Sequence, residues 1–339
     1  MPNNWFPELQ VSGNAFDRGF AHGCEFRHRI EKTIEYYRKL FALSEERLLG
    51  QANIYKDIIS RFSSHYATEI EGIAEGARIE PLLIYALNSR SEILNNCNIP
   101  ECTSALNTAE SILCQNWDWS EPLEDLVILL RVERQDGHRM ATLTEPGMLA
   151  KVGMNSAGLG VCLNILQARQ YLRGLPVHIL LRAILDCGSM SKVRSLVSAN
   201  APGKASHVLV ADRAGNYLSA EFSADKHYLL EADDGLLWHS NHYLASEALN
   251  QAEAFPSTRE RWHRAGQLIR DDKSPQGMWQ LLQDQTEQEM SICRPYSPSA
   301  TPGFGRVGTV FSLSMDLKKG TMRIRRGCDP ANADYTISV

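Results

Sequence analysis

A single cysteine, Cys102, begins the stretch of this sequence with the richest potential for nucleophilic chemistry. It follows a polar connector that closes with Pro100, and it heads an apolar run that predicts a strand. Asn116 and Asp118 follow at the end of a second predicted strand, and an antiparallel hairpin of that length returns Asp118 close to Cys102. A thiol beside a carboxylate suits a cysteine nucleophile, although a buried structural cysteine and a turn aspartate fit the same spacing.

Two other constellations have less specific chemistry. The glycine-rich segment Gly153–Gly160 lacks the Lys-Ser/Thr of a phosphate-binding loop, and we interpret it as a turn that enters a strand. His239 and His242 are three residues apart without a third ligand nearby, so we predict no metal site. His22 and His28 fall in a helical region, and we assign them to the surface or the edge of the core.

The elements that must position these residues differ between two parts of the chain. Residues 1 to about 100 have mostly helical periodicity: one helix is expected over 28–49, another along the apolar stripe from Ile58 to Ala77, and a third from Pro81. From residue 101 onward, short strands alternate with turns such as Asp136-Gly137 and Lys318-Lys319-Gly320. Helices are expected at 176–186, 191–198 and 258–270, and from Ser274. The pattern predicts an α+β layered architecture.

Composition excludes several classes of protein. The 339 residues carry 35 Lys+Arg against 40 Asp+Glu, a net charge of −5, which provides no basic field for nucleic acid. No apolar run is long enough to span a bilayer, and no secretion signal follows Met1, so we expect a cytoplasmic protein without a membrane partner. The eight cysteines form no CxxC pair, which argues against a disulfide scaffold or a zinc ribbon.

A series of short motifs, weak singly but specific in this order and spacing, covers nearly the whole chain. They are Gly13–Gly23, Glu69–Ala77, Cys102–Ser104, Asn116–Trp119, Gly153–Leu159, Leu163–Asn164, Ser240–His242, Ile292–Arg294 and Gly308–Leu317. In them the chain resembles the penicillin (isopenicillin-N) acyltransferase family, also called the acyl-CoA:6-aminopenicillanate acyltransferase family. This family belongs to the N-terminal-nucleophile (Ntn) hydrolases, with bile-salt hydrolases and acid ceramidase as distant relatives.

The resemblance implies a four-layer αββα sandwich with Cys102 at the start of a central strand. It also implies a precursor that cuts its own Glu101–Cys102 bond. The products are a helical segment of residues 1–101 and a catalytic core of residues 102–339, which together form an αβ heterodimer, with an (αβ)2 assembly as a further option. The best-known members of the family have glycine before the nucleophile, where this chain has Glu101.

The implied mechanism takes both nucleophile and base from Cys102. The new α-amine, with a pKa of about 7.7–8.0, accepts the thiol proton, and a thiol of pKa about 8.5 needs little help to ionise. By match to the family, Asn241 and Asn164 are the oxyanion donors and Asp118 orients the amine and thiol. Arg306, or Arg294 in its place, is expected to hold Asp118 or a substrate carboxylate. The substrate-binding residues expected from the resemblance are Arg306, Asn155 and Trp117.

The expected function is hydrolysis of a linear amide in an N-acyl or peptide-like small molecule through a thioester, with no cofactor. One alternative is a biosynthetic N-acyltransferase that passes the acyl group to an amine. A non-catalytic binding protein of the same fold is another. A redox-sensing thiol protein is the last, with Cys97 or Cys114 as the resolving cysteine.

Overall fold

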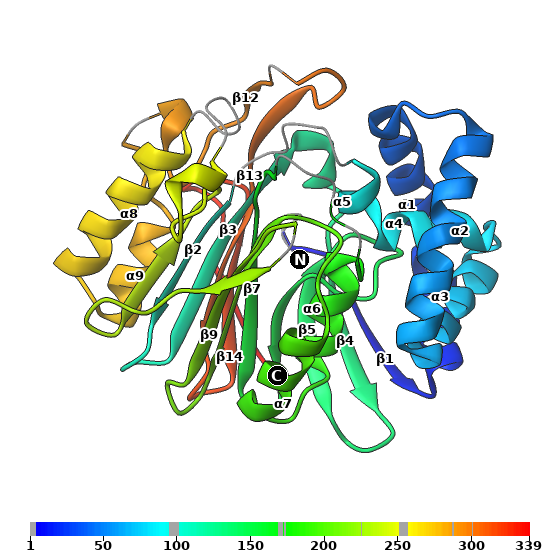
Figure 1. Ribbon diagram of the computed structural model, residues 1–339, viewed down its shortest axis with the longest axis horizontal. Coiled ribbons are helices and arrows are strands. Elements are labelled where there is room, and N and C mark those ends of the chain that lie inside the picture. Colours follow the sequence, from blue (N-terminus) through cyan, green and yellow to red (C-terminus); the bar gives the residue numbers. More distant parts are fainter. Residues whose placement is uncertain are drawn as a thin grey trace.

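The computed structural model describes residues 5–94, 102–168, 172, 174–224, 226–250, 257–286, 288–299 and 301–339. Within these ranges the strands form two sheets that face each other (Figure 1). The first sheet has the spatial order β1 (Glu8–Gly13), β4 (Ile128–Arg134), β5 (Arg139–Thr144), β6 (Val152–Asn155), β7 (Leu159–Ile165), β8 (Ser206–Asp212), β9 (Tyr217–Phe222) and β10 (His227–Leu229). The second has the order β11 (Leu236–His239), β2 (Cys102–Asn107), β3 (Ile112–Ser120), β13 (Arg306–Asp316), β14 (Thr321–Arg326) and β15 (Tyr335–Ser338), with β12 (Ser297–Pro298) paired to β13.

Helices cover the outer face of each sheet. α6 (Val177–Leu185) and α7 (Met190–Ala199) pack on the first sheet, and α8 (Thr258–Asp271) and α9 (Pro275–Leu281) pack on the second (Figure 1). The short 3-10 turns are η1 (Glu121–Leu123), η2 (Glu247–Leu249) and η3 (Gln288–Met290). The prediction of an αββα sandwich is therefore confirmed.

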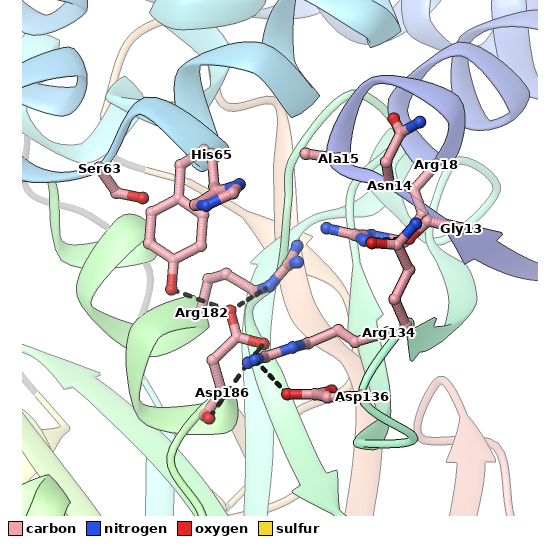
Figure 2. Close-up of a pocket in the computed structure, with 12 residues that line it drawn as sticks. Gly13, Asn14, Ala15, Arg18, Ser63, His65, Arg134, Asp136, Arg182 and Asp186 are labelled. Atoms are coloured by element: carbon pink, nitrogen blue, oxygen red, sulfur yellow. Dashed lines mark hydrogen bonds and ion pairs between the residues drawn. The ribbon is translucent and has the colours of Figure 1, made fainter.

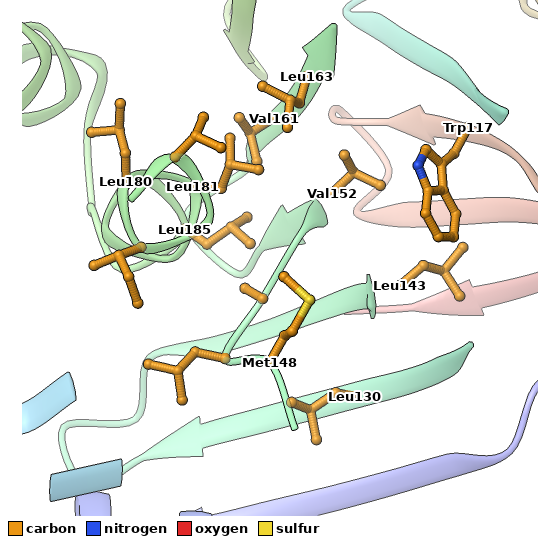
Figure 3. Packing of buried hydrophobic residues seen from close by; sticks show 14 of the residues in the cluster. Trp117, Leu130, Leu143, Met148, Val152, Val161, Leu163, Leu180, Leu181 and Leu185 are labelled. Atoms are coloured by element: carbon orange, nitrogen blue, oxygen red, sulfur yellow. The ribbon is translucent and has the colours of Figure 1, made fainter. Parts of the chain in front are cut away.

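The core lies between the sheets and beneath α6. Figure 3 shows Leu143 of the first sheet near Trp117 of the second, and Val161 and Leu163 on the other face of the first sheet, beside Leu181 of α6. All of these side chains are almost fully buried. These strands are buried on both faces and therefore consist of nearly continuous apolar residues rather than alternating ones.

The predicted turns and caps form for the expected local reasons. Asp136-Gly137 joins β4 to β5, and Gly137 has φ +81°, which an L side chain rarely adopts. Lys318-Lys319-Gly320 joins β13 to β14 in the same way. Ser274 caps α9 by accepting a hydrogen bond from the backbone of Gly277 at 3.0 Å. The turn expected within Gly153–Gly160 lies at residues 156–158, between the end of β6 and the start of β7.

Residues 15–93 form a helical group beside the sandwich (Figure 1). Its helices are α1 (Ala15–Phe41), α2 (Glu45–Phe62), α3 (Ser64–Ala77), α4 (Pro81–Asn88) and α5 (Arg90–Ile93). The single helix expected from Ile58 to Ala77 is wrong, because the chain is extended at Ser63 between α2 and α3. The helix expected over 28–49 is also wrong, since α1 begins and ends earlier and α2 begins at Glu45.

The glycines of the two early motifs allow α1 and α3 to cross at very short distance. A Cβ added to Gly19 would lie 2.0 Å from the carbonyl oxygen of Glu69, and one added to Gly76 would lie 2.2 Å from that of Phe20. Both approaches are closer than real Cβ atoms tolerate, so these positions require glycine.

β1 departs from the helical expectation for this region. It pairs in parallel with β4 at the edge of the first sheet, with Leu9 opposite Leu130 and Val11 opposite Val132. Six residues are too few to display a clear period, and the long helix that follows dominates the pattern. The helical segment therefore contributes a strand to the core of the molecule.

A buried ion-pair cluster fastens the same segment to the core. Glu69 of α3 accepts from Arg18 of α1 at 2.6 Å and from Arg182 of α6 at 2.8 Å, and all three side chains are at least nine-tenths buried. Figure 2 shows Arg182 and Arg134 directed at Asp186, at 3.1 and 3.2 Å. Burial alone would raise the pKa of Glu69, but the two arginines outweigh it and hold that pKa below its ordinary value.

His22 is buried, contrary to its expected place at the surface or the edge of the core. Its Nε2 accepts from the backbone N–H of Gly147 at 3.0 Å, so the ring is neutral in the folded chain. Burial lowers the pKa of His22 from 6.5 to about 4, against the opposing charge of Glu69.

This histidine predicts acid sensitivity. His22 of the unfolded chain is protonated below pH 6.5, whereas His22 of the folded chain is protonated only below about pH 4. The free energy of unfolding therefore falls as the pH is lowered from about 6.5 to about 4. Between pH 7 and pH 5 the loss from this group is on the order of 2 kcal/mol. We expect His22→Gln, whose amide oxygen also accepts from Gly147, to lose less stability over the same interval in urea unfolding. Equal losses in both chains would contradict the assignment.

None of the helices in the described part of the chain combines the length and the apolar composition that crossing a bilayer requires.

Candidate active site

Cys102 is the first residue of β2, which lies between β11 and β3 inside the second sheet. β2 and β3 form the predicted hairpin, and Cys102 pairs with Trp117 across it. Paired residues present their side chains on one face of a sheet. Two residues further along β2, Ser104 on this face bonds to Asn164 of β7, so the face that carries Cys102 and Trp117 is turned toward the first sheet.

Three side chains from distant parts of the sequence hold the backbone of Cys102. Its N–H donates to Oδ1 of Asn241 at 2.8 Å. Its carbonyl oxygen accepts from Nδ2 of Asn164 at 3.1 Å and from Nη1 of Arg261 at 2.7 Å. The structure thus brings Cys102, Asn164 and Asn241 together and adds Arg261 to them.

Arg261 determines how Asn241 is oriented. Its Nη2 donates to Oδ1 of Asn241 at 2.9 Å, and a guanidinium cannot accept, so the amide oxygen must face both Arg261 and the N–H of Cys102. Nδ2 of Asn241 then donates to the carbonyl of Ile165 at 2.9 Å. A carboxamide NH2 carries two protons, so donation to an oxyanion would use the second one.

Asn164 is oriented through a histidine. Its Oδ1 accepts from the hydroxyl of Ser104 at 2.6 Å and lies 3.1 Å from Nδ1 of His207. Because a carbonyl oxygen only accepts, His207 carries its proton on Nδ1, and its Nε2 accepts from Ser219 at 2.8 Å. Burial lowers the pKa of His207 well below its ordinary value, which keeps the ring neutral. The NH2 group of Asn164 is therefore fixed toward the carbonyl of Cys102.

Asp118 acts on Cys102 from the other face of the sheet. It follows Trp117 on β3, so strand alternation separates its carboxylate from the indole ring, and its Oδ1 accepts from Thr309 at 2.7 Å. Burial, and next the charge of Asp118, raise the pKa of the Cys102 thiol to about 11. The uncut chain therefore holds a protonated thiol, whereas the sequence led us to expect one that ionises with little help.

A lysine that the sequence analysis did not single out lies against Trp117. Lys151 is buried, and its Nζ lies 3.0 Å from the centroid of the indole ring and 3.3 Å from Oε2 of Glu145. Burial lowers the pKa of Lys151 well below its ordinary value, against the raising effect of the charge of Glu145. The charges of Lys151 and Cys102 also influence each other. A buried amine therefore accompanies the thiol between the two sheets.

Arg306 is not joined to the Cys102 cluster by its contacts. It begins β13 with a side chain 53% exposed, and it donates to Glu121 at 2.7 Å and to the carbonyl of Tyr296 at 2.8 Å. Its alternative, Arg294, supports Asp118 indirectly: its backbone N–H donates at 2.8 Å to the hydroxyl of Thr309 that bonds to Asp118.

Asn155 serves the turn between β6 and β7. Its amide NH2 donates to the carbonyls of Leu185 and Cys187, and its Oδ1 accepts from the backbone of Leu159. Leu159 is five residues before Asn164 on β7, which separates the two asparagines by about 17 Å along the strand. The substrate-binding roles of Asn155, Arg306 and the buried Trp117 stay predictions, and Glu101 lies outside the described residues.

His239 and His242 are engaged in hydrogen bonds. Nε2 of His239 lies 2.7 Å from Glu221, and Nδ1 of His242 lies 3.0 Å from the hydroxyl of Thr258. Across the part of the chain that the structure describes, no three His, Cys, Asp or Glu residues are grouped so as to hold a metal ion.

Arg261 and Lys151 are the site residues that sequence reasoning missed, yet each left a signal. Arg261 stands at the head of the buried stripe Arg261, Ala265, Ile269 of α8, where an apolar residue is usual. Lys151 is the lone charge in the otherwise apolar run from Met148 to Met154. A buried charge in an apolar pattern needs a partner, and that partner is often functional.

Comparison with known proteins gives a family and a relative of full length. The family model described as acyl-coenzyme A:6-aminopenicillanic acid acyl-transferase matches residues 106–329. The acyl-coenzyme A:6-aminopenicillanic-acid-acyltransferase 40 kDa form of Emericella nidulans is 28% identical over 351 residues, which cover 97% of this chain and 94% of that protein.

Solved structures with partial similarity have low identity. The Caenorhabditis elegans orthologue of N-acylethanolamine-hydrolyzing acid amidase is 18% identical, with a TM-score of 0.45 over 64% of this chain and 93% of that one. A mutant of the conjugated bile acid hydrolase from Clostridium perfringens is 13% identical, with a TM-score of 0.47 over 71% and 92%. Penicillin V acylase from Agrobacterium tumefaciens is 11% identical, with a TM-score of 0.48 over 70% and 86%.

Proposed function

The chain belongs to the acyl-coenzyme A:6-aminopenicillanic acid acyl-transferase family, and from this premise we propose that it is a self-processing amide hydrolase with Cys102 as its nucleophile. The observation that carries the proposal is the convergence of Asn241, Asn164 and Arg261 on the backbone nitrogen and oxygen of Cys102. A merely structural cysteine at a strand end needs only its ladder partners, whereas an amino-terminal nucleophile needs its nitrogen and carbonyl fixed.

Maturation proceeds by attack of the Cys102 sulfur on the carbonyl carbon of Glu101. The C–N bond to Cys102 breaks, the nitrogen gains a proton, and a thioester forms between Glu101 and Cys102. Water then adds to the acyl carbon, which frees the Glu101 carboxylate and restores the thiol. The result is a core that begins with Cys102 and carries a free α-amine.

In turnover that α-amine is the base. The nitrogen of Cys102 already donates to Asn241, so the new amine stays in place beside its own thiol. It accepts the thiol proton, the sulfur attacks the substrate carbonyl, and the amine later protonates the leaving nitrogen. Amide protons of Asn241 and Asn164 stabilise the oxyanion, and water releases the acyl group from the thioester.

A second candidate is transfer of the acyl group to an amine, which the name of the family favours. Hydrolysis and transfer share every step up to the thioester and differ only in whether water or an amine attacks it. A non-catalytic role fits poorly, because the ionisable side chains of Arg261 and Lys151 are buried around one thiol. The cytoplasmic location and an (αβ)2 assembly stay predictions.

The test combines mass and activity. Intact-mass spectrometry of the purified protein should give two polypeptides, residues 1–101 and residues 102–339, the second beginning with cysteine. That material is then incubated with a panel of N-acyl amino acids, N-acyl ethanolamines and penicillins, with and without hydroxylamine as acceptor. Release of free acid supports hydrolysis, and formation of hydroxamate supports transfer. An uncut chain that releases neither would refute the proposal.

We predict that the two fragments remain together after the cut. β1 lies in the first sheet, and Glu69 is buried between Arg18 and Arg182, so departure of the segment would expose a sheet edge and leave buried charge. Gel filtration should therefore show both polypeptides in one peak. Glu69→Gln, which leaves Arg18 without its counter-charge and Arg182 with that of Asp186 alone, should cost on the order of 3–5 kcal/mol and release the segment at lower temperature. A fragment of residues 102–339 that elutes alone and active would contradict the prediction.

A further inference from the structure

Self-cleavage needs a proton acceptor other than the α-amine of Cys102, which serves as the base in turnover. Before the cut, the nitrogen of Cys102 is an amide whose N–H donates to Asn241, and an amide nitrogen has no basic lone pair. The thiol is protonated, because burial raises its pKa to about 11. The α-amine that serves as base in the mature enzyme does not yet exist. Another group must accept the first proton.

Asp118, Lys151 and Arg261 are the charged groups with the largest effect on the pKa of the thiol, and the thiol of Cys162 also interacts with it. Burial raises the pKa of Cys162 well above its ordinary value, so that thiol keeps its own proton. A guanidinium has only N–H donors, so Arg261 cannot accept the proton. The carboxylate of Asp118 lies across the sheet from the Trp117 face and accepts from Thr309. Lys151 remains, on the face that carries the thiol.

The position of Lys151 suits this task. Its Nζ lies 3.0 Å from the ring centroid of Trp117, the residue paired with Cys102, so the amine lies on the same face of the second sheet as the thiol. Glu145 lies 3.3 Å from the Nζ and is itself held by Arg90 at 2.8 Å and by the hydroxyl of Tyr37 at 2.7 Å. The amine is therefore anchored on one side by a fixed carboxylate.

We propose that Lys151 is the general base of self-cleavage, which accepts the Cys102 thiol proton while the Glu101–Cys102 bond is intact. This inference rests on the proposed function. The Sγ–H proton moves to Nζ of Lys151, and the sulfur bonds to the Glu101 carbonyl carbon. The C–N bond then breaks, and Lys151 returns its proton to the departing nitrogen of Cys102. The lysine ends as it began, and the α-amine that it helped to create replaces it in turnover.

Glu145 has a positioning role in this step, and it connects cleavage to docking of the amino-terminal segment. Arg90 of α5 and Tyr37 of α1 both belong to that segment, and they complete the shell of Glu145. When the segment is packed against the core, Arg90 and Tyr37 hold the carboxylate of Glu145 in position beside Lys151. The inference therefore makes cleavage depend on a segment that is already packed against the core.

The test follows cleavage of the full-length chain during cell-free synthesis, on denaturing gels. Lys151→Met keeps an unbranched apolar chain against Trp117, and Lys151→Arg places a permanent positive charge there without a group that can accept a proton. Both should slow cleavage about 100-fold, the low end of what a general base contributes. Lys204→Met is the matched control, since Lys204 is another buried lysine whose charge acts on Glu92. It should cleave at the normal rate.

Several outcomes would overturn the inference. Normal cleavage of Lys151→Arg would mean that a positive charge at this position is sufficient and that no base is needed there. Normal cleavage of Lys151→Met would mean that the lysine has no part in the step. Near-ultraviolet circular dichroism checks folding: the spectra of the uncut Lys151 variants must match that of Cys102→Ala. If Lys151→Met does not fold, the cleavage rate of Lys151→Arg alone tests the inference. Cleavage of Cys102→Ala at the same bond would instead refute self-processing itself, so failure of the inference and failure of the proposed function are distinguishable.

Discussion

Cys102→Ala should accumulate as one uncut polypeptide of 339 residues and show no amide turnover. Its sulfur is the only atom in the proposed scheme that attacks the Glu101 carbonyl, so its removal abolishes cleavage rather than slowing it. The change removes one buried sulfur atom and introduces no polar group, so the fold should survive. Cys102→Ser should cleave slowly, because a hydroxyl is a poorer nucleophile at neutral pH.

Cys114→Ala is the matched control for this variant. Cys114 is a buried cysteine on β3, and it faces away from the inner face where Cys102 and Trp117 lie. It should be cut as fast as the unchanged chain. Cut Cys102→Ala protein would mean that a separate protease performs the cleavage.

Asn241→Asp should lower kcat/KM by about 10²–10³ or more, the loss typical of one missing oxyanion donor. The change replaces a donor by a negative charge that opposes the developing oxyanion. The same charge beside the nitrogen of Cys102 favours the ammonium form of the α-amine, which cannot accept the thiol proton. The effect should therefore be at least as large as that of Asn241→Ala. Steady-state kinetics on protein quantified by its content of processed chain checks this.

The control must separate loss of chemistry from loss of stability. In Asn241→Asp a carboxylate oxygen meets the carbonyl of Ile165, which costs stability as well. Asn88 is also a fully buried asparagine whose NH2 donates to backbone carbonyls, those of Ile84 and Gly147. Asn88→Asp should lower the melting temperature but leave kcat/KM of the folded enzyme unchanged. Near-normal kcat/KM in Asn241→Ala would remove Asn241 from the site.

The sequence was informative about the fold where local chemistry decides structure. Asp136-Gly137 produced its hairpin, and Pro81 began α4. It was uninformative where contacts with distant parts of the chain decide the structure. Residues 8–13 form a strand because they pair with β4, and the break between α2 and α3 at Ser63 lies inside an apolar stripe that continues across it. Neither cause is visible within a short window of residues.

For the candidate site as well, the sequence was informative about residues close together in the chain and uninformative about contacts that depend on packing. The hairpin and its spacing placed Cys102 beside Asp118, and the resemblance drew attention to Asn164 and Asn241. Arg306 was chosen as the arginine of the site because of its place in the chain, whereas Arg261 reaches Cys102 from a helix that packs on the second sheet. Which arginine contacts Cys102 depends on how this helix packs on the sheet, and this packing is not visible in the order of residues along the chain.

The parallel pairing of β1 with β4 also determines an order of events during synthesis. Each residue of β1 pairs with one made about 120 positions later, which takes roughly 6–24 s at the usual rates of translation. The strand and the helices behind it must therefore wait, unpaired, on the ribosome. Asn241 and Arg261 are made later still, so Cys102 cannot acquire its hydrogen-bonded surroundings before β4 is available to β1. In the proposed scheme, the order of translation therefore delays the cut until β4 is available to pair with β1.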